Sequence, residues 1–96
     1  RLFMHITFAT KQVRDMCEKG QLAVRRFGSP AASALKGFIA DLEVASLLED
    51  LPYPRSSQSG VETFTLDDGL QVVLSTDSAS LKKSVSSIRI EKVQRA

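Results

Sequence analysis

The sequence has few of the residues that most often hold a metal, form a disulfide or cross a membrane. It contains no tryptophan, one histidine and one cysteine, and no apolar run approaches the roughly 20 residues of a membrane span. A single cysteine, Cys17, excludes an internal disulfide and favours a reducing compartment. There is no cysteine–histidine cluster of metal-ligand spacing and no glycine-rich phosphate loop, so we expect neither a metal nor another cofactor.

The rest of the composition is typical of a small folded protein. The 96 residues are 43% hydrophobic and 25% charged, and this length predicts one domain covering residues 1–96. The N-terminus lacks a signal-peptide pattern, so the expected location is the cytoplasm, with no membrane partner. A net charge of +2 does not by itself indicate nucleic acid. The basic residues nevertheless gather in the first third and near the end of the chain, which separates them from most of the acids.

Apolar periodicity predicts six elements in the order β-α-α-β-β-β. Thr10 is the expected N-cap of the first helix and Gly28 its C-cap, and Ser29-Pro30 begins the second helix. Gly20 weakens the first helix by about 1 kcal/mol relative to alanine, which allows a break there. The expected helices cover residues 10–27 and 31–48, the expected strands residues 2–8, 61–66, 70–75 and 85–93, and residues 55–60 form a polar loop.

The predicted fold class is α+β, with a helical hairpin packed on one face of a mostly antiparallel sheet. The turn at Asp67-Asp68-Gly69 is a strong hairpin signal. In the first helix, the expected apolar face consists of Val13, Met16, Cys17, Val24 and Phe27. Alternation in the strands leaves one polar sheet face uncovered, lined by Thr63, Thr65, Gln71, Arg89 and Glu91.

Five short motifs follow one another along the chain. They are Met4-His5-Ile6-Thr7-Phe8-Ala9, Met16-Cys17-Glu18, Arg25-Arg26-Phe27-Gly28, a helix with Leu42 and Ala45 before Leu51-Pro52, and Val85-Ser86-Ser87-Ile88-Arg89-Ile90. In this order, spanning nearly the whole chain, they resemble the HigB-like "killer protein" branch of the RelE/ParE-type toxins of bacterial toxin–antitoxin pairs. The resemblance implies a RelE/ParE-like fold and the toxin component of a type II system.

The resemblance also implies an activity and partners. Toxins of this branch are mRNA interferases, metal-independent endoribonucleases that bind the ribosome, cut messenger RNA in the A site and so inhibit translation. A helix-turn-helix antitoxin is the expected neutralising partner, and operator DNA would be contacted only through that antitoxin.

Cleavage of RNA without a metal needs a base for the 2′-hydroxyl, a proton for the leaving oxygen and stabilisation of charge at phosphorus. Arg89 suits the last task because a guanidinium binds two phosphate oxygens. Glu91 shares its face and is a candidate base, and Lys92 completes the expected catalytic set although strict alternation puts it on the opposite face. Contacts to RNA are expected from Arg14, Arg25, Arg26, Gln71, Lys82 and Lys83.

Each of these assignments has a structural alternative. Arg89 and Glu91 also fit a surface ion pair, and the helix cations fit a solvated helix face. His5 lies in the first strand, away from the expected catalytic region, and is interpreted as a structural or surface residue. Cys17, on an apolar helix face, is interpreted as a core residue.

Two departures from the HigB-like pattern leave other functions open. Relatives usually carry a histidine after the Leu-Pro segment, where residues 55–60 have none, and an arginine at the position of Gln71. A catalytically inactive binding protein with the toxin fold, including a ParE-like gyrase inhibitor, is therefore an alternative. A plain interaction domain unrelated to toxins is another.

Overall fold

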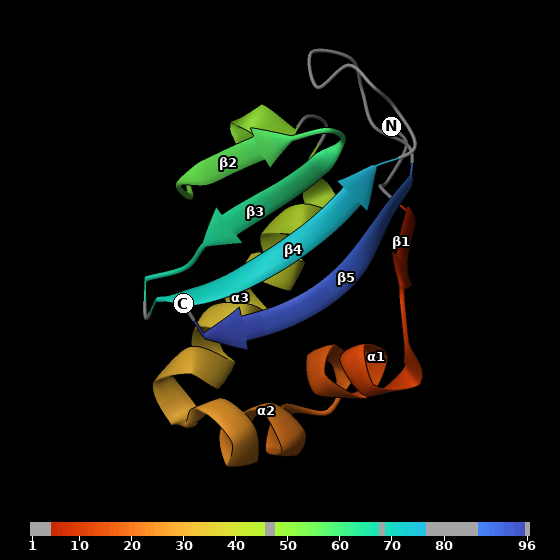
Figure 1. The fold of residues 1–96 in the computed structure, drawn as a ribbon. Helices are drawn as coiled ribbons and strands as arrows, with labels where there is room; N and C mark the ends of the chain where they lie inside the picture. Colours follow the sequence, from red (N-terminus) through yellow and green to blue (C-terminus); the bar gives the residue numbers. More distant parts are fainter. Residues whose placement is uncertain (1–4, 46–47, 68, 77–86, 96) are drawn as a thin grey trace.

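A twisted five-stranded sheet backed by one long helix organises the structure (Figure 1). The computed structural model describes residues 5–45, 48–67, 69–76 and 87–95. Within these residues the elements are β1 (His5–Phe8), α1 (Lys11–Glu18), α2 (Gly20–Phe27), α3 (Ser29–Val44), the 3₁₀ helix η1 (Leu48–Asp50), β2 (Arg55–Gln58), β3 (Val61–Thr65), β4 (Leu70–Thr76) and β5 (Ser87–Arg95). None of the described helices is long and apolar enough to cross a membrane.

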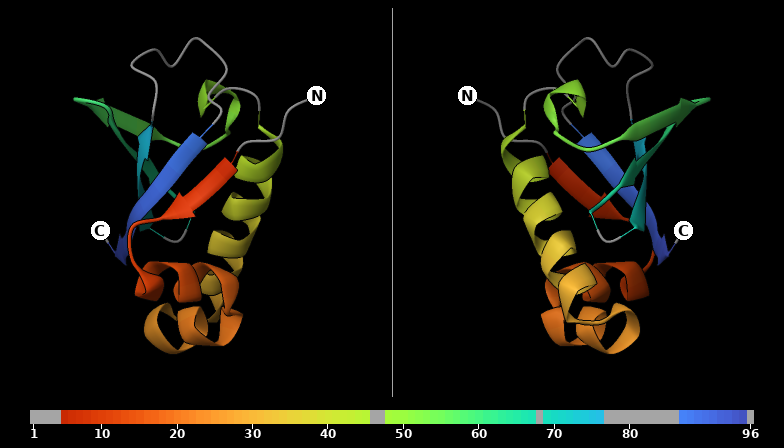
Figure 2. Two further views of the ribbon diagram at one scale, coloured as in Figure 1. Left: turned by 90° about the vertical axis from the view of Figure 1, so that its right-hand side faces the viewer. Right: turned by 90° about the vertical axis from the view of Figure 1, so that its left-hand side faces the viewer.

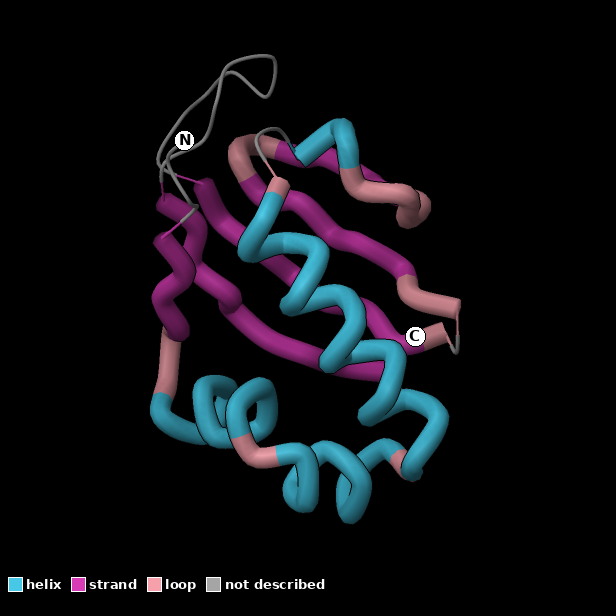
Figure 3. Tube along the Cα trace, turned by 180° about the vertical axis from the view of Figure 1, so that it is seen from behind, coloured by secondary structure: helices cyan, strands magenta, loops and turns pink. Residues whose placement is uncertain are grey.

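The sheet has the strand order β1-β5-β4-β3-β2 and is mixed. Strand β1 pairs with β5 in parallel, whereas β5–β4, β4–β3 and β3–β2 are antiparallel. Helix α3 covers one face of the sheet, and α1 and α2 lie together at the end where α3 begins (Figures 2 and 3). The α+β class is therefore confirmed, but three helices replace the predicted hairpin of two.

The predicted first helix is interrupted between α1 and α2. Thr10 caps α1 as predicted, with its Oγ1 accepting a hydrogen bond from Val13 N at 3.1 Å. Lys19 then adopts an extended backbone conformation, and α2 starts at Gly20. The break rotates the second half of the segment, so that Ala23 is buried and Val24 is 44% exposed. The prediction that Val24 lies on the apolar face was therefore wrong.

Helix α3 carries the centre of the core. Phe38 is fully buried, and its ring packs edge-on against Tyr53 and at a tilt against Phe64, with centroid separations of 5.2 and 5.3 Å. Gly28, with φ of 91°, ends α2 and precedes α3; this backbone conformation is accessible to glycine at little cost. The core joins α3 to the inner sheet face through Leu35, Phe38, Leu42, Phe64, Leu66, Leu70, Val72, Leu74, Ile88 and Ile90.

Strand β2 occupies the segment that the sequence predicted as a polar loop. A two-residue turn, Ser59-Gly60, with φ of 51° and 81°, joins it to β3. Both φ values are positive, as in the turns that suit tight hairpins. Beside the turn, Glu62 is only 2% exposed and accepts a hydrogen bond from Ser57 Oγ at 2.5 Å. Arg55 Nε lies 3.5 Å from the same carboxylate, so the polar side chains of β2 compensate a buried charge.

Tyr53 connects the segment after η1 to α3. Its hydroxyl donates a 2.6 Å hydrogen bond to Asp41 Oδ2. This bond, together with partial burial and the charge of Asp41, raises the pKa of Tyr53 to about 12. Because the pKa of the folded state exceeds the ordinary value of about 10, the stabilisation is complete below pH 10 and is lost as the pH rises through 12.

The tyrosinate absorbance of the folded protein is therefore expected to appear near pH 12. Tyr53 is the only tyrosine and the chain has no tryptophan, so the signal reports this residue alone. Asp41→Asn, which removes the charged acceptor, is expected to move the pKa of Tyr53 back toward 10. A midpoint near pH 10 in the folded wild-type protein would contradict the assignment.

Candidate functional site

The sheet face turned away from α3 is covered by no other described element (Figure 1). We call it the open face. The strand registers assign to it His5, Thr7, Val61, Thr63, Thr65, Gln71, Val73, Ser75, Arg89, Glu91, Lys92 and Gln94. The five residues predicted to line the uncovered face are all among them. The open face is thus mostly polar, with Val61 and Val73 among its apolar residues, in contrast to the apolar face beneath α3.

A β-bulge in β5 decides which side chains reach the open face. Val73 pairs with Lys92 and Leu74 pairs with Ile90, so Glu91 is an extra residue on β5. Ile90 and Val93 both belong to the core although they are three residues apart. Glu91 and Lys92 between them therefore both lie on the open face. The prediction from strict alternation, that Lys92 lies opposite Glu91, was wrong for this reason.

Arg89, Glu91 and Lys92 form the charged centre of the open face. Ser75 Oγ donates a 2.6 Å hydrogen bond to Glu91 Oε2, which orients the carboxylate. The side chains of Arg89 and Lys92 are exposed, and neither side chain makes a hydrogen bond or ion pair within the described part of the chain. The surface ion pair considered for Arg89 and Glu91 is therefore not formed. Two unpaired cations and one oriented carboxylate give this part of the face a net positive charge.

Gln71 lies on the open face in β4, opposite Gln94 of β5. Its Oε1 accepts a 3.2 Å hydrogen bond from Gln94 Nε2 on the neighbouring strand. The pair extends the polar surface beyond Lys92, and each amide keeps further donors and acceptors for a ligand. Gln71 is thus on the predicted face, although without the charge that an arginine would supply.

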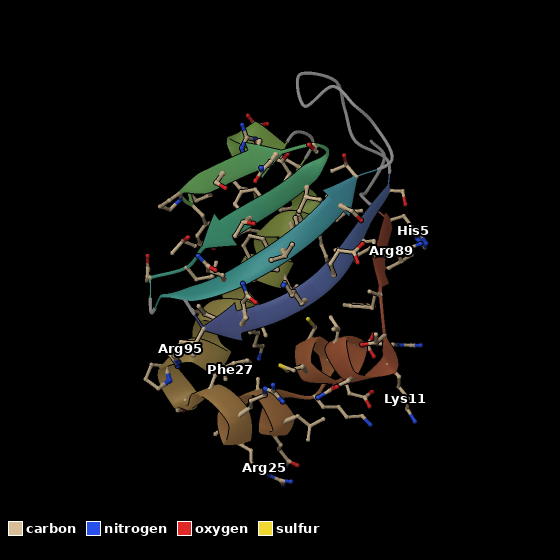
Figure 4. The ribbon with its side chains drawn as sticks, in the orientation of Figure 1. His5, Lys11, Arg25, Phe27, Arg89 and Arg95 are labelled. Atoms are coloured by element: carbon tan, nitrogen blue, oxygen red, sulfur yellow. The ribbon has the colours of Figure 1, made fainter. Side chains whose placement is uncertain are left out.

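The other predicted RNA-binding residues are not brought together with this centre. Arg14 is on α1 and forms an exposed ion pair with Glu18 at 3.2 Å. Arg25 is on α2 and points away from the sheet (Figure 4), and the Arg26 guanidinium lies 5.8 Å from the Phe27 ring centroid. Lys82 and Lys83 lie outside the described residues.

His5 is a surface residue, and strand pairing places it on the open face, which the sequence did not predict. In the parallel pairing of β1 with β5, His5 is opposite Ser87 and Thr7 is opposite Arg89. His5 is exposed, and Figure 4 shows it at the same edge of the sheet as Arg89. Nothing local in the sequence carried this signal, because the two residues are separated by more than 80 positions and meet only through strand pairing.

The described residues contain no group of three or more histidine, cysteine, aspartate or glutamate side chains placed to hold a metal ion. Cys17 is half-buried and packs against the core cluster. Burial, and then the negative charge of Glu18, raise the pKa of the thiol to about 12. A thiol that stays protonated at neutral pH is a poor nucleophile, which agrees with a packing role.

Comparisons with known proteins found no match of the chain to a protein-family model, a curated protein or a solved structure.

Proposed function

We propose that the protein is a RelE/ParE-like toxin of a type II toxin–antitoxin system, acting as a metal-independent endoribonuclease on messenger RNA at the ribosome. The motifs in the sequence suggest the family, and the open face supplies groups suited to the chemistry. In this proposal a helix-turn-helix antitoxin neutralises the protein, and operator DNA is bound only through that antitoxin.

One observation carries the proposal: Arg89 and Lys92 are exposed on the open face without ion-pair partners in the described chain, while Ser75 orients Glu91 between them. A phosphodiester carries the negative charge that two such cations attract. Phosphate binding by Arg89 would bring the scissile group within reach of a carboxylate.

The three side chains have distinct tasks in this mechanism. Arg89 binds two oxygens of the phosphate and stabilises the charge that grows on them during the reaction. Glu91 takes the proton of the 2′-hydroxyl, which then attacks phosphorus. Lys92, next to Glu91, holds an adjacent phosphate as a point charge. Thr63, Thr65, Gln71 and Gln94 offer uncharged donors and acceptors to the rest of a single strand.

The proposal is tested by inducible expression of the protein in a bacterial host, with growth, protein synthesis and transcript ends followed together. We expect growth arrest, a loss of protein synthesis, and cuts that appear only in messenger RNA that is being translated. Soluble, folded protein that neither arrests growth nor cuts transcripts would contradict the ribonuclease and favour a binding-only relative of the toxins. Growth arrest with intact transcripts and supercoiling defects would instead favour gyrase inhibition.

A further inference from the structure

We propose that His5 is the second proton-transfer residue of this site, and that it protonates the leaving oxygen while Glu91 takes the proton of the attacking hydroxyl. This inference rests on the proposed ribonuclease function and adds to it a residue from the opposite end of the chain.

The register of β1 and β5 determines where His5 lies relative to Arg89. Thr7 is directly opposite Arg89, and His5 is two residues away on the same face, opposite Ser87. Strand spacing puts the Cα atoms of His5 and Arg89 roughly 8 Å apart, a span that two long side chains can share across one phosphate. Both side chains are exposed, and both lie at the same edge of the sheet (Figure 4).

Arg89 is therefore flanked on two sides. Glu91 follows it along β5, roughly 7 Å away between Cα atoms, and His5 lies in the opposite direction along the sheet, on β1. Lys92 is on the same side of Arg89 as Glu91. Among the described residues of the open face, His5 is the titratable side chain on the other side.

This order matches what displacement at phosphorus requires. The attacking and leaving oxygens are roughly in line through phosphorus, so the base and the acid must stand on opposite sides of it. A phosphate on Arg89 has Glu91 on one side and His5 on the other. Imidazole suits the acid because its ring nitrogens can both donate and accept a proton.

The step balances without another reactant. Glu91 accepts the proton of the 2′-hydroxyl, the O2′–P bond forms, and the P–O5′ bond breaks. The His5 imidazolium gives its proton to the departing 5′ oxygen and becomes neutral. The products are a 2′,3′-cyclic phosphate and a 5′-hydroxyl, and a proton returning from Glu91 to His5 through solvent restores the site.

The test compares two single-stranded RNA substrates, one natural and one in which sulfur replaces the 5′ bridging oxygen at the cleavage site. A thiolate leaves without needing a proton. We expect His5→Gln to cut the natural RNA about 10²- to 10⁴-fold more slowly than the wild type, and the sulfur substrate at nearly the wild-type rate. Glu91→Gln is expected to cut both substrates slowly, because Glu91 activates the attacking 2′-hydroxyl and both substrates need that step.

Lys11→Gln is the matched control, since Lys11 is an exposed cation on α1 near the end of β1 (Figure 4). It should cut both substrates at the wild-type rate. A His5→Gln protein that cuts natural RNA normally, or that is equally slow on both substrates, would overturn the inference while the ribonuclease function stands. A wild-type protein that cuts neither substrate, free or on ribosomes, would overturn both.

Discussion

Arg89→Ala is expected to lower the rate of RNA cleavage by about 10²- to 10³-fold, the usual cost of removing one group that stabilises developing charge. The Arg89 side chain is exposed and makes no hydrogen bond or ion pair with the described chain. Truncating this side chain therefore breaks no hydrogen bond or ion pair among the described residues, and the free energy of unfolding should change by less than about 0.5 kcal/mol. The loss of activity would then belong to the chemistry and not to the fold.

Two further variants complete this test: one separates the geometry of the guanidinium from its charge, and the other is a control. Arg89→Lys keeps the charge but loses the planar fork that binds two phosphate oxygens, so we expect it to recover only part of the rate. Lys36→Ala removes an exposed cation from α3, behind the sheet, and should leave the rate unchanged. The measurements are initial rates of cleavage at fixed salt and the thermal midpoint of each variant. Normal cleavage by Arg89→Ala would remove Arg89 from the mechanism.

Phe38→Ala is expected to have the largest effect on stability, lowering the free energy of unfolding by about 3–5 kcal/mol. Phe38 is fully buried and its ring contacts both Tyr53 and Phe64, which belong to different parts of the chain. The substitution leaves a cavity between α3 and the sheet. A domain of this length has a total stability of about 5–14 kcal/mol, so the variant should be close to unfolding.

Urea unfolding followed by far-UV circular dichroism measures this effect. Val44→Ala is the control, because Val44 lies on the same helix but is 51% exposed; its free energy of unfolding should change by no more than about 0.5 kcal/mol. A loss below about 1.5 kcal/mol for Phe38→Ala would mean that the core repacks around the missing ring. Such a small loss would contradict a central role of Phe38 in the core.

Where the physical cause is local, the sequence predicted the structure well. The hydroxyl of Thr10 caps the helix that follows it, and Gly28 separates two helices because glycine accepts a positive φ. Asp67-Asp68-Gly69 marked the β3–β4 hairpin, which the strand pairing confirms. Alternation along β3 and β4 identified the faces of both strands. These signals act within a few residues, so a single sequence contains them.

Strand β2 was missed although part of its signal was local. Ser59-Gly60 is a two-residue turn signal, but the strand before it, Arg55–Gln58, has no apolar alternation. Its polar side chains are needed because the strand lies against the buried carboxylate of Glu62. The burial of that charge is a property of the assembled core, so the sequence pattern alone did not predict the strand.

The sequence by itself determined the helices and strands that begin or end at a cap or turn residue, and the apolar inner face of the sheet. It also identified Arg89, Glu91 and Lys92 as the candidate charged centre. Only the tertiary structure decided that a bulge turns Lys92 to the open face and that parallel pairing brings His5 to the same edge of that face as Arg89. The physical reason is that register is a relation between strands: the core burial of both Ile90 and Val93 fixes the bulge, and contacts between the two ends of the chain fix the position of His5.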